Sequence, residues 1–351
     1  MTFIVGLVIL GILIVIHEFG HFLAAKLTGV KVFEFAVGFG PKLLSHRFGE
    51  TIFSLRIIPL GGFVSLAGMD ETNEEVESER SFANKSYLQK IFIISAGPLA
   101  NFLTAILFVW LTIFIFGEQI PNPAPVIGDV VSFSPAQKAG FKRGDLILSV
   151  NEIDIKEFKD IAPLIQSSNG VIKFRVKRDN QILELYVEPI VESEAEAFLR
   201  DEKATRKLIG LVAQFDYKKV KFGDSWEIAF QQTVITSATI LKAVYGLVTS
   251  KISKKELAGP LTIISEAGAN VKRGLRSVLI FMFILSVNLA LLNLLPIPLL
   301  DGGHIIVISV ESLLHRSVPH FIKSAINFLG LAFLLFLTLF VLKNDIKRLF
   351  F

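Results

Sequence analysis

Residues 3–25 read FIVGLVILGILIVIHEFGHFLAA, an apolar stretch that only His17, Glu18 and His21 interrupt. The stretch is long enough to cross a bilayer as one helix, which needs about 20 apolar residues. A charged side chain at the centre of a bilayer costs at least ~2.5–3.5 kcal/mol, so ionisable residues inside a span indicate function. The two histidines are four residues apart and lie on one face of a helix. This pattern is typical of a helix that binds one zinc ion through two imidazoles, with the intervening glutamate beside the water.

The composition is that of a membrane protein with several spans. The chain has 351 residues, of which 52% are hydrophobic, and its mean hydropathy is +0.59. Segments of sufficient apolar length predict four transmembrane helices, at residues 3–25, 91–116, 277–297 and 325–342. There is no cysteine, which excludes disulfides and a cysteine-ligated metal. Residues 1–25 lack the positive start of a signal peptide and are expected to stay in the protein.

The charge pattern predicts the orientation of the spans. The net charge is +4, and because no basic stripe is interleaved with aromatic residues, no nucleic-acid partner is expected. The loop at 26–90 is rich in cations, whereas the N-terminal side of the first span has no charged side chain. The positive-inside rule therefore places this loop on the cytoplasmic face. His17 lies roughly 21 Å along a helix from Phe3, so the motif is near that face. The cations of the loop are Lys26, Lys31, Lys42, Arg47, Arg56, Arg80, Lys85 and Lys90.

Two features complicate the count of spans. Lys343, Lys347 and Arg348 fall outside the cytoplasm if there are four spans. A fifth span at 224–250 would move them inside, but that segment is polar along Ile228–Leu241 and predicts an amphipathic helix at the interface. A fifth span would also place Asp301 on the wrong face, so four spans are favoured.

Two soluble segments separate the first spans. Residues 51–66 are rich in β-formers around Pro59-Leu60-Gly61-Gly62, which predicts a hairpin with a glycine turn. The acidic run at 70–79 is expected to be a solvated loop. The remaining histidines lack ligand spacing to the motif and are expected in loops; they are His46, His304, His315 and His320.

Residues 120–190 predict a separate α+β unit. Strands are expected at 126–133, 144–151, 171–178 and 181–188, with a helix near 157–168. The pattern AGF-x-x-GD-x-I-x-x-VN at 139–151 resembles a PDZ domain of the bacterial protease type. PDZ domains bind peptides by adding a strand to a sheet edge. The alternative is a folded spacer without a ligand.

A hydrolytic zinc site needs a third protein ligand and one open position. Asp301 is the best candidate, because Pro296 and Pro298 cannot continue the third span and the chain must extend there. The residues alone leave open whether Asp301 binds a metal or caps a helix that starts at Ile305.

Taken in order along the chain, these motifs resemble the site-2 protease family of intramembrane zinc metalloproteases, and most closely the bacterial sigma-E regulator protease subgroup. The matching segments are HEFGH at 17–21, GFGP at 38–41, PLGGFV at 59–64, GPLAN at 97–101, GPL at 259–261 and NLLPIPLLDG at 293–302. The resemblance implies a polytopic α-helical membrane protein with four transmembrane helices, a membrane-re-entrant β-hairpin and one inserted extracytoplasmic PDZ domain. Its parts would be 1–116, a PDZ domain at 117–200, an extracytoplasmic linker with an interface helix at 201–276, and 277–351.

The resemblance also implies roles for single residues. His17, His21 and Asp301 would bind Zn²⁺, and Glu18 would be the catalytic base. Substrate contacts would come from Asn293, Gly61, Gly62 and Phe63. The protein would lie in the bacterial inner membrane, cut single-span membrane proteins, and take peptide ends at its PDZ groove. Asn101 and Asn288 are interpreted as residues that bridge helices.

Three alternatives remain. A membrane HExxH peptidase that cuts soluble or prenylated peptides would use a glutamate as third ligand. A catalytically inactive, PDZ-bearing membrane scaffold would bind without hydrolysis. A transporter would also place polar groups in its spans, but no inverted repeat is evident.

Overall fold

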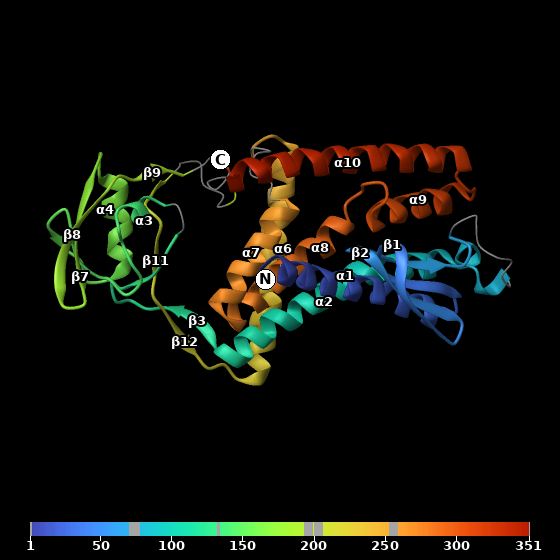
Figure 1. Ribbon diagram of the computed structural model, residues 1–351, viewed down its shortest axis with the longest axis horizontal. Coiled ribbons are helices and arrows are strands. Elements are labelled where there is room, and N and C mark those ends of the chain that lie inside the picture. The colour runs from blue at the N-terminus through green and yellow to red at the C-terminus, as the bar shows by residue number, and fades with distance from the viewer. Residues whose placement is uncertain are drawn as a thin grey trace. The chain divides into compact units, whose positions relative to one another are not determined.

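The computed structural model describes residues 2–69, 78–131, 134–192, 199, 206–252 and 259–350 (Figure 1). The chain forms two compact units. The first consists of Met1–Thr112, Trp226–Leu241 and Lys255–Phe351, and it contains the HExxH motif and Asp301. The second consists of Ile113–Ser225 and Lys242–Lys254.

Among the described residues, four helices are long and apolar enough to cross a membrane. They are α1 (Thr2–Leu27), α2 (Tyr87–Phe116), α8 (Leu275–Asn293) and α10 (His320–Phe350). Between 11% and 28% of their most apolar windows is buried, so most of their surface is free to face lipid.

These helices cover the four segments predicted as spans, and their bounds differ by a few residues. The third was expected to reach residue 297, but α8 ends at Asn293. Pro296 and Pro298 have no backbone N–H and interrupt the helix, and α9 (Asp301–Leu314) follows.

In the first unit, which contains the four apolar helices and is called the membrane unit below, helix α1 packs against two other helices. A Cβ atom at Gly20 would lie 2.3 Å from the carbonyl oxygen of Ala96, so the glycine allows α2 to approach α1 closely. Near the other end of α1, a Cβ at Gly6 would lie 2.9 Å from Cα of Ile264 in α7 (Pro260–Arg273). Both contacts depend on a residue without a side chain.

Strands β1 (Val32–Phe48) and β2 (Thr51–Leu66) follow α1 and form an antiparallel pair that turns at Gly49-Glu50. The prediction of a turn at Gly61-Gly62 is therefore wrong, because β2 runs through those glycines. Residues 34–37 pair with both 62–65 and 52–55, so they lie between the two halves of β2. Among the pairings of the described strands, segment 62–66 has a partner on one side only and forms an edge of the sheet.

Hydrogen-bonded ion pairs connect this sheet with the end of α1. Glu50 at the turn accepts hydrogen bonds of 2.6 Å from Lys26 of α1 and from Arg80 of η1 (Ser78–Arg80). Helix η2 (Phe82–Asn84) follows and leads into α2. Of the predicted acidic loop, residues 70–77 lie outside the described part of the chain.

The segment predicted as an amphipathic helix at 224–250 is α6 (Phe222–Val248), and it is not among the four candidate spans. The sequence analysis did not predict α7. Its first turn is capped from a distance, because the buried carboxylate of Asp345 in α10 accepts hydrogen bonds from the backbone N–H groups of Gly259, Leu261 and Thr262. This carboxylate joins the end of the last span to the start of α7.

The second unit has the strand and helix order expected from the PDZ-like pattern. A four-stranded sheet has the order β6-β5-β7-β8, and Phe174 is completely buried in its core. The strands of this sheet are β5 (Leu146–Val150), β6 (Ile153–Asp154), β7 (Ile172–Arg178) and β8 (Gln181–Val187). Its helices are α3 (Pro135–Lys138), η3 (Phe158–Asp160) and α4 (Ile161–Ser167).

Shorter strand pairs complete the unit. They are β4 (Ile127–Val130) with β11 (Leu211–Ala213), β9 (Ile190–Val191) with β10 (Lys207–Leu208), and β3 (Glu118–Pro121) with β12 (Phe215–Lys218). Since β11 pairs with β4, the folded unit extends past the predicted boundary at residue 200, at least to Ala213.

Candidate metal centre

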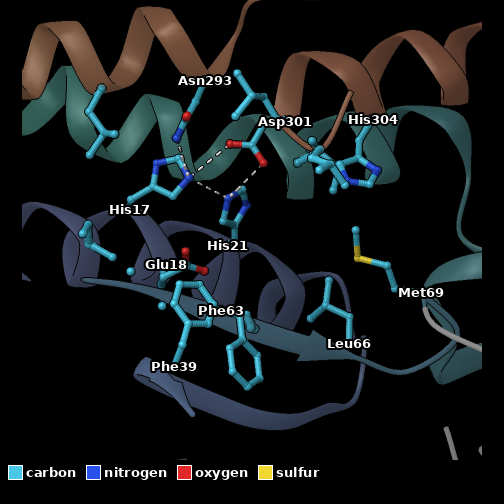
Figure 2. A pocket seen from close by; sticks show the side chains of 18 residues that line it. His17, Glu18, His21, Phe39, Phe63, Leu66, Met69, Asn293, Asp301 and His304 are labelled. Atoms are coloured by element: carbon cyan, nitrogen blue, oxygen red, sulfur yellow. Dashed lines mark hydrogen bonds and ion pairs between the residues drawn. The ribbon is translucent and has the colours of Figure 1, made fainter. Parts of the chain in front are cut away.

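Three side chains from two separate elements converge in the membrane unit (Figure 2). His17 and His21 lie on α1, and Asp301 is the first residue of α9. Nε2 of His17 lies 3.2 Å from Nε2 of His21 and 3.1 Å from Oδ2 of Asp301. Nε2 of His21 lies 3.4 Å from Oδ1 of Asp301. The structure thus brings together the three residues expected to bind zinc.

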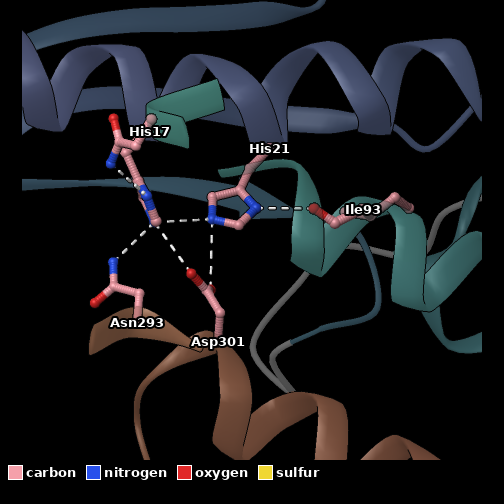
Figure 3. A network of polar contacts seen from close by, with 6 residues as sticks. His17, His21, Ile93, Asn293 and Asp301 are labelled. Atoms are coloured by element: carbon pink, nitrogen blue, oxygen red, sulfur yellow. Dashed lines mark hydrogen bonds and ion pairs between the residues drawn. The ribbon is translucent and has the colours of Figure 1, made fainter. Parts of the chain in front are cut away.

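These distances fit a tetrahedral zinc site. Protein nitrogen and oxygen ligands lie about 2.0–2.2 Å from zinc, so two ligand atoms at a tetrahedral ion are about 3.3–3.6 Å apart, close to the distances found here. The protonation of the His21 ring also fits a metal ligand. Nδ1 of His21 lies 2.8 Å from the carbonyl oxygen of Ile93 and must donate to it, so in the neutral ring Nε2 carries a lone pair (Figure 3). Oδ2 of Asp301 is buried and has no hydrogen-bond partner among the described residues. A cation would satisfy these lone pairs.

The chain after α8 delivers Asp301 to the histidines. Leu299 has a φ of +73°, a left-handed conformation within the irregular segment before α9. A Cβ at Gly302 would lie 2.3 Å from the carbonyl oxygens of Leu294 and Leu295, and a Cβ at Gly303 would lie 2.3 Å from that of Ile297. The two glycines therefore let α9 start against the preceding loop. The alternative that Asp301 caps a helix from Ile305 is wrong, because α9 already begins at Asp301.

The GPLAN segment of α2 shapes the other side of the site. A Cβ at Gly97 would lie 2.3 Å from Nε2 of His21, so this position has room only for glycine. Ile93, in the preceding turn of α2, directs its carbonyl oxygen to Nδ1 of His21. A carbonyl that accepts from Nδ1 fixes the tautomer that a metal needs.

His17 has two amide neighbours. The side chain of Asn101 on α2 lies 3.2 Å from Nδ1, and that of Asn293 at the end of α8 lies 3.3 Å from Nε2. Asn101 is completely buried. The sequence analysis interpreted it only as a residue that bridges helices. Its place in GPLAN on a second span was the signal that could have linked it to the site.

A cavity of about 500 Å³ opens in front of these ligands. Glu18, Asn293, Gly61, Gly62 and Phe63 all line it, so the expected base and substrate-contact residues share one space. A Cβ at Gly62 would lie 3.0 Å from Cγ of Glu18, so the edge segment of β2 passes close to this carboxylate.

Aromatic rings form one wall of the cavity. The ring of Phe63 stacks on that of Phe39 at a centroid distance of 6.3 Å, and both residues line the cavity (Figure 2). His304 also lines it, from α9. The expectation of loop positions is therefore wrong for His304, and also for His46 in β1 and His320 at the start of α10.

Comparison with known proteins shows which family the chain belongs to. The model of peptidase family M50 matches residues 5–337. A candidate zinc metalloprotease of Rickettsia conorii is 36% identical, and the alignment covers 100% of both chains. A candidate zinc metalloprotease of Helicobacter pylori is 36% identical over 99% of both chains, and a candidate protease of Enterococcus faecalis is 28% identical over 100% of both.

A solved PDZ domain from Listeria monocytogenes matches 27% of this chain and 93% of its own, at 15% identity and a TM-score of 0.22. This likeness is too weak to add to the strand order described above. The match of the family model over nearly the whole chain is decisive: the chain belongs to peptidase family M50, the site-2 protease family of zinc metalloproteases.

Proposed function

We propose that this membrane zinc metalloendopeptidase hydrolyses peptide bonds within or beside the transmembrane segment of single-span membrane proteins. The observation that carries the proposal is the convergence of His17, His21 and Asp301 inside a bundle of lipid-facing helices. A metal site in that position can reach a substrate that is itself embedded in the bilayer.

His17, His21 and Asp301 would hold the zinc ion, and Glu18 would act as general base. When bound, zinc lowers the pKa of water toward ~7 and polarises the carbonyl to be attacked. Glu18 lines the same cavity as the three ligands and would take the proton of the attacking water. It would then pass this proton to the leaving amine.

Asn293 has the position of a group that supports the transition state. Its amide lies 3.3 Å from the ligating nitrogen of His17 and faces the cavity. An amide donor to the developing oxyanion contributes ~2.7–4 kcal/mol in comparable sites. The cavity that Asn293 faces is lined by residues of α1, α8 and β2, so substrate would enter between these elements.

A helical substrate must be extended before it can be cut, because its carbonyl groups are hydrogen-bonded within the helix. The edge segment 62–66 offers replacement bonds, since it has a sheet partner on one side only among the described strands. Gly61 and Gly62 leave the start of this edge without side chains, and Phe63 forms the neighbouring wall. Such pairing would hold the peptide bond of the extended substrate beside Glu18.

The contacts of α10 support its crossing the bundle beside the other spans. About a third of the way along α10, a Cβ at Gly330 would lie 2.5 Å from Cβ of Pro298, in the loop that precedes Asp301. Near the end of α10, Asp345 caps α7, which packs near the start of α1 at Gly6. Helix α10 thus contacts both the loop before Asp301 and the start of α7, as expected for one crossing of the bundle.

In a topology of four spans with the metal site near the cytoplasmic face, the PDZ-like unit lies outside the cytoplasm of a bacterial inner membrane. It would take peptide ends at its groove or hold back bulky proteins. The substrates expected for such an arrangement are anchored fragments, for example the stub of an anti-sigma factor left by a first protease or a remnant signal peptide.

The experiment that tests the proposal is substrate trapping with Glu18→Gln in cells that lack the wild-type protein. Membrane-anchored single-span fragments should accumulate and co-purify with the variant. Glu266→Gln, which changes an exposed carboxylate of α7, is the control and should leave their turnover unchanged. Continued cleavage of the trapped fragments by Glu18→Gln would refute the role of Glu18, and enrichment of only soluble proteins would refute the substrate class.

A further inference from the structure

A second cavity, of about 310 Å³, lies between the start of α2 and the end of α9. Two cations line it, Lys90 of α2 and Arg316, which follows α9. Hydroxyl groups lie beside them, from Tyr87 and from Ser312 and Ser317. Lysine, arginine and hydroxyl groups together are the donors that bind phosphate oxygens.

Among the described residues that line this region, cations outnumber carboxylates. A neighbouring cavity of about 320 Å³ also contains Lys90, together with Lys323 and Glu311. Glu311 lines both cavities and is bound by Lys323, whose Nζ lies 2.7 Å away. Among the ion pairs found within the described ranges, neither Lys90 nor Arg316 has a carboxylate partner within 4.0 Å. Within the described ranges, the two cavities are thus lined by three cations and one carboxylate, and a bound anion would add negative charge there.

The cavity lies at the level where lipid headgroups are expected. Tyr87 is the first residue of α2 and of its candidate span, and tyrosine is typical of the boundary between bilayer and water. Large apolar side chains next to the lining residues Tyr87 and Ser312 are exposed: Leu88 by 75% and Leu313 by 79%. Acyl chains would cover such residues, whereas water would leave them unfavourably exposed.

We propose that this cavity binds the phosphate of an anionic phospholipid headgroup, through Lys90, Arg316 and the adjacent hydroxyl groups. Basic pockets between transmembrane helices are suited to anionic headgroups. Tyr87 and Ser309 already join the two helices, with their oxygens 3.2 Å apart, and a bound headgroup would add further bonds between α2 and α9.

The site is connected to the catalytic centre through α9. The helix carries Asp301 at its first residue and Ser312 near its last. The neighbouring cavity shares Met69 and His304 with the catalytic cavity, and Figure 2 shows both at the end of that cavity away from Asn293. A lipid that fixes α9 against α2 would therefore also steady Asp301.

The test measures lipid binding to the delipidated full-length protein by native mass spectrometry, with dioleoyl-phosphatidylglycerol and with dioleoyl-phosphatidylcholine. The affected variant is Lys90→Gln with Arg316→Gln. The matched control is Lys343→Gln with Arg273→Gln, which removes one lysine and one arginine from exposed positions at the opposite helix ends. Each cation is expected to contribute about fivefold in affinity, so the affected variant should bind phosphatidylglycerol about 25-fold more weakly.

The control should match the wild type, and Lys90→Arg with Arg316→Lys should keep most of the binding. Zinc content and helix content establish that the affected variant is folded. Equal affinity of the wild type for the two lipids would overturn the proposal, and so would unchanged phosphatidylglycerol binding by the affected variant. A third arm uses inorganic phosphate, which should not displace the lipid at equal concentration; displacement would show a site for free anions instead.

Discussion

The side-chain amide of Asn101 lies 3.2 Å from Nδ1 of His17, and no part of this asparagine reaches solvent. Its Oδ1 has no hydrogen-bond partner among the described residues, while its backbone oxygen accepts a 2.8 Å bond from Ser286 of α8. If the side-chain amide of Asn101 is rotated by 180°, its Oδ1 accepts a hydrogen bond from Nδ1–H of His17. That bond would leave Nε2 of His17 unprotonated and directed at the metal position.

We therefore expect Asn101→Ala to bind zinc about 10–100-fold more weakly, the effect typical of losing a group that orients a ligating histidine. Competition with a chelator measures this affinity directly. Asn101→Asp keeps an acceptor and should retain most of the affinity. Asn288→Ala on α8 is the control. If Asn101→Ala bound zinc as tightly as the wild type, the asparagine would only bridge helices.

Gly97 provides a sharper steric test. The Cβ of Gly97→Ala would lie 2.3 Å from Nε2 of His21, so the imidazole must move from its ligating position. Zinc affinity and peptidase activity should each fall by about tenfold or more, because a misplaced reacting group costs that much or more. Gly11→Ala is the control on α1, where a Cβ would meet no atom within 4 Å. Equal zinc affinity in the two variants would contradict the position of His21.

The sequence predicted the four apolar helices and the positions of the strands along the second unit, because both follow from local patterns of apolar residues. It failed at Gly61-Gly62, where glycines were interpreted as a turn. Gly61 instead makes room for the ring of Phe39, and Gly62 for Glu18, and the turn is at Gly49-Glu50. A pattern along the chain does not tell a glycine needed for a turn from one needed for a close approach.

The metal site was predictable only in part for a related reason. The spacing of His17 and His21 places them on one helix face, which local geometry decides. The contribution of Asp301 depends on a loop 280 residues further on, and the residues alone left its role open. Asn101 and Ile93 could not be placed, because their contacts depend on which face of α2 packs against α1.

The absence of native cysteine makes the topology testable by labelling. We expect Arg47→Cys, in β1, to react with a membrane-impermeant maleimide only after the cytoplasmic side is opened. Lys159→Cys, whose lysine side chain is 77% exposed, and a cysteine appended after Phe351 should react in intact spheroplasts. Labelling of the C-terminal cysteine and Arg47→Cys from the same side would require an odd number of spans.

The charge cluster at the sheet turn should make stability depend on pH. Hydrogen bonds from Lys26 and Arg80 lower the pKa of Glu50 below its ordinary value of 4.5. A lowered pKa in the folded state means that the contribution is complete above pH 4.5 and is lost as the pH falls through the lowered pKa. Because Glu50 and its partners Lys26 and Arg80 are partly exposed, their contribution to the free energy of unfolding should be below ~1 kcal/mol.

Thermal unfolding in detergent should therefore show a lower midpoint for Glu50→Gln than for the wild type at pH 7. The difference should shrink as the pH falls below 4.5. Glu79→Gln, in η1, is the control and should follow the wild type throughout. A difference that grows in acid would mean that the cluster does not act through the ionised carboxylate of Glu50.

The most direct test of the proposed metal centre is the zinc content of purified Asp301→Ala beside that of the wild type, by mass spectrometry of the metal after dialysis against a chelator. The wild type should retain one zinc ion per chain. Asp301→Ala should lose most of it while its helix content stays the same, because only the two nitrogen ligands of α1 remain. Full zinc retention by Asp301→Ala would contradict a metal held jointly by α1 and the start of α9.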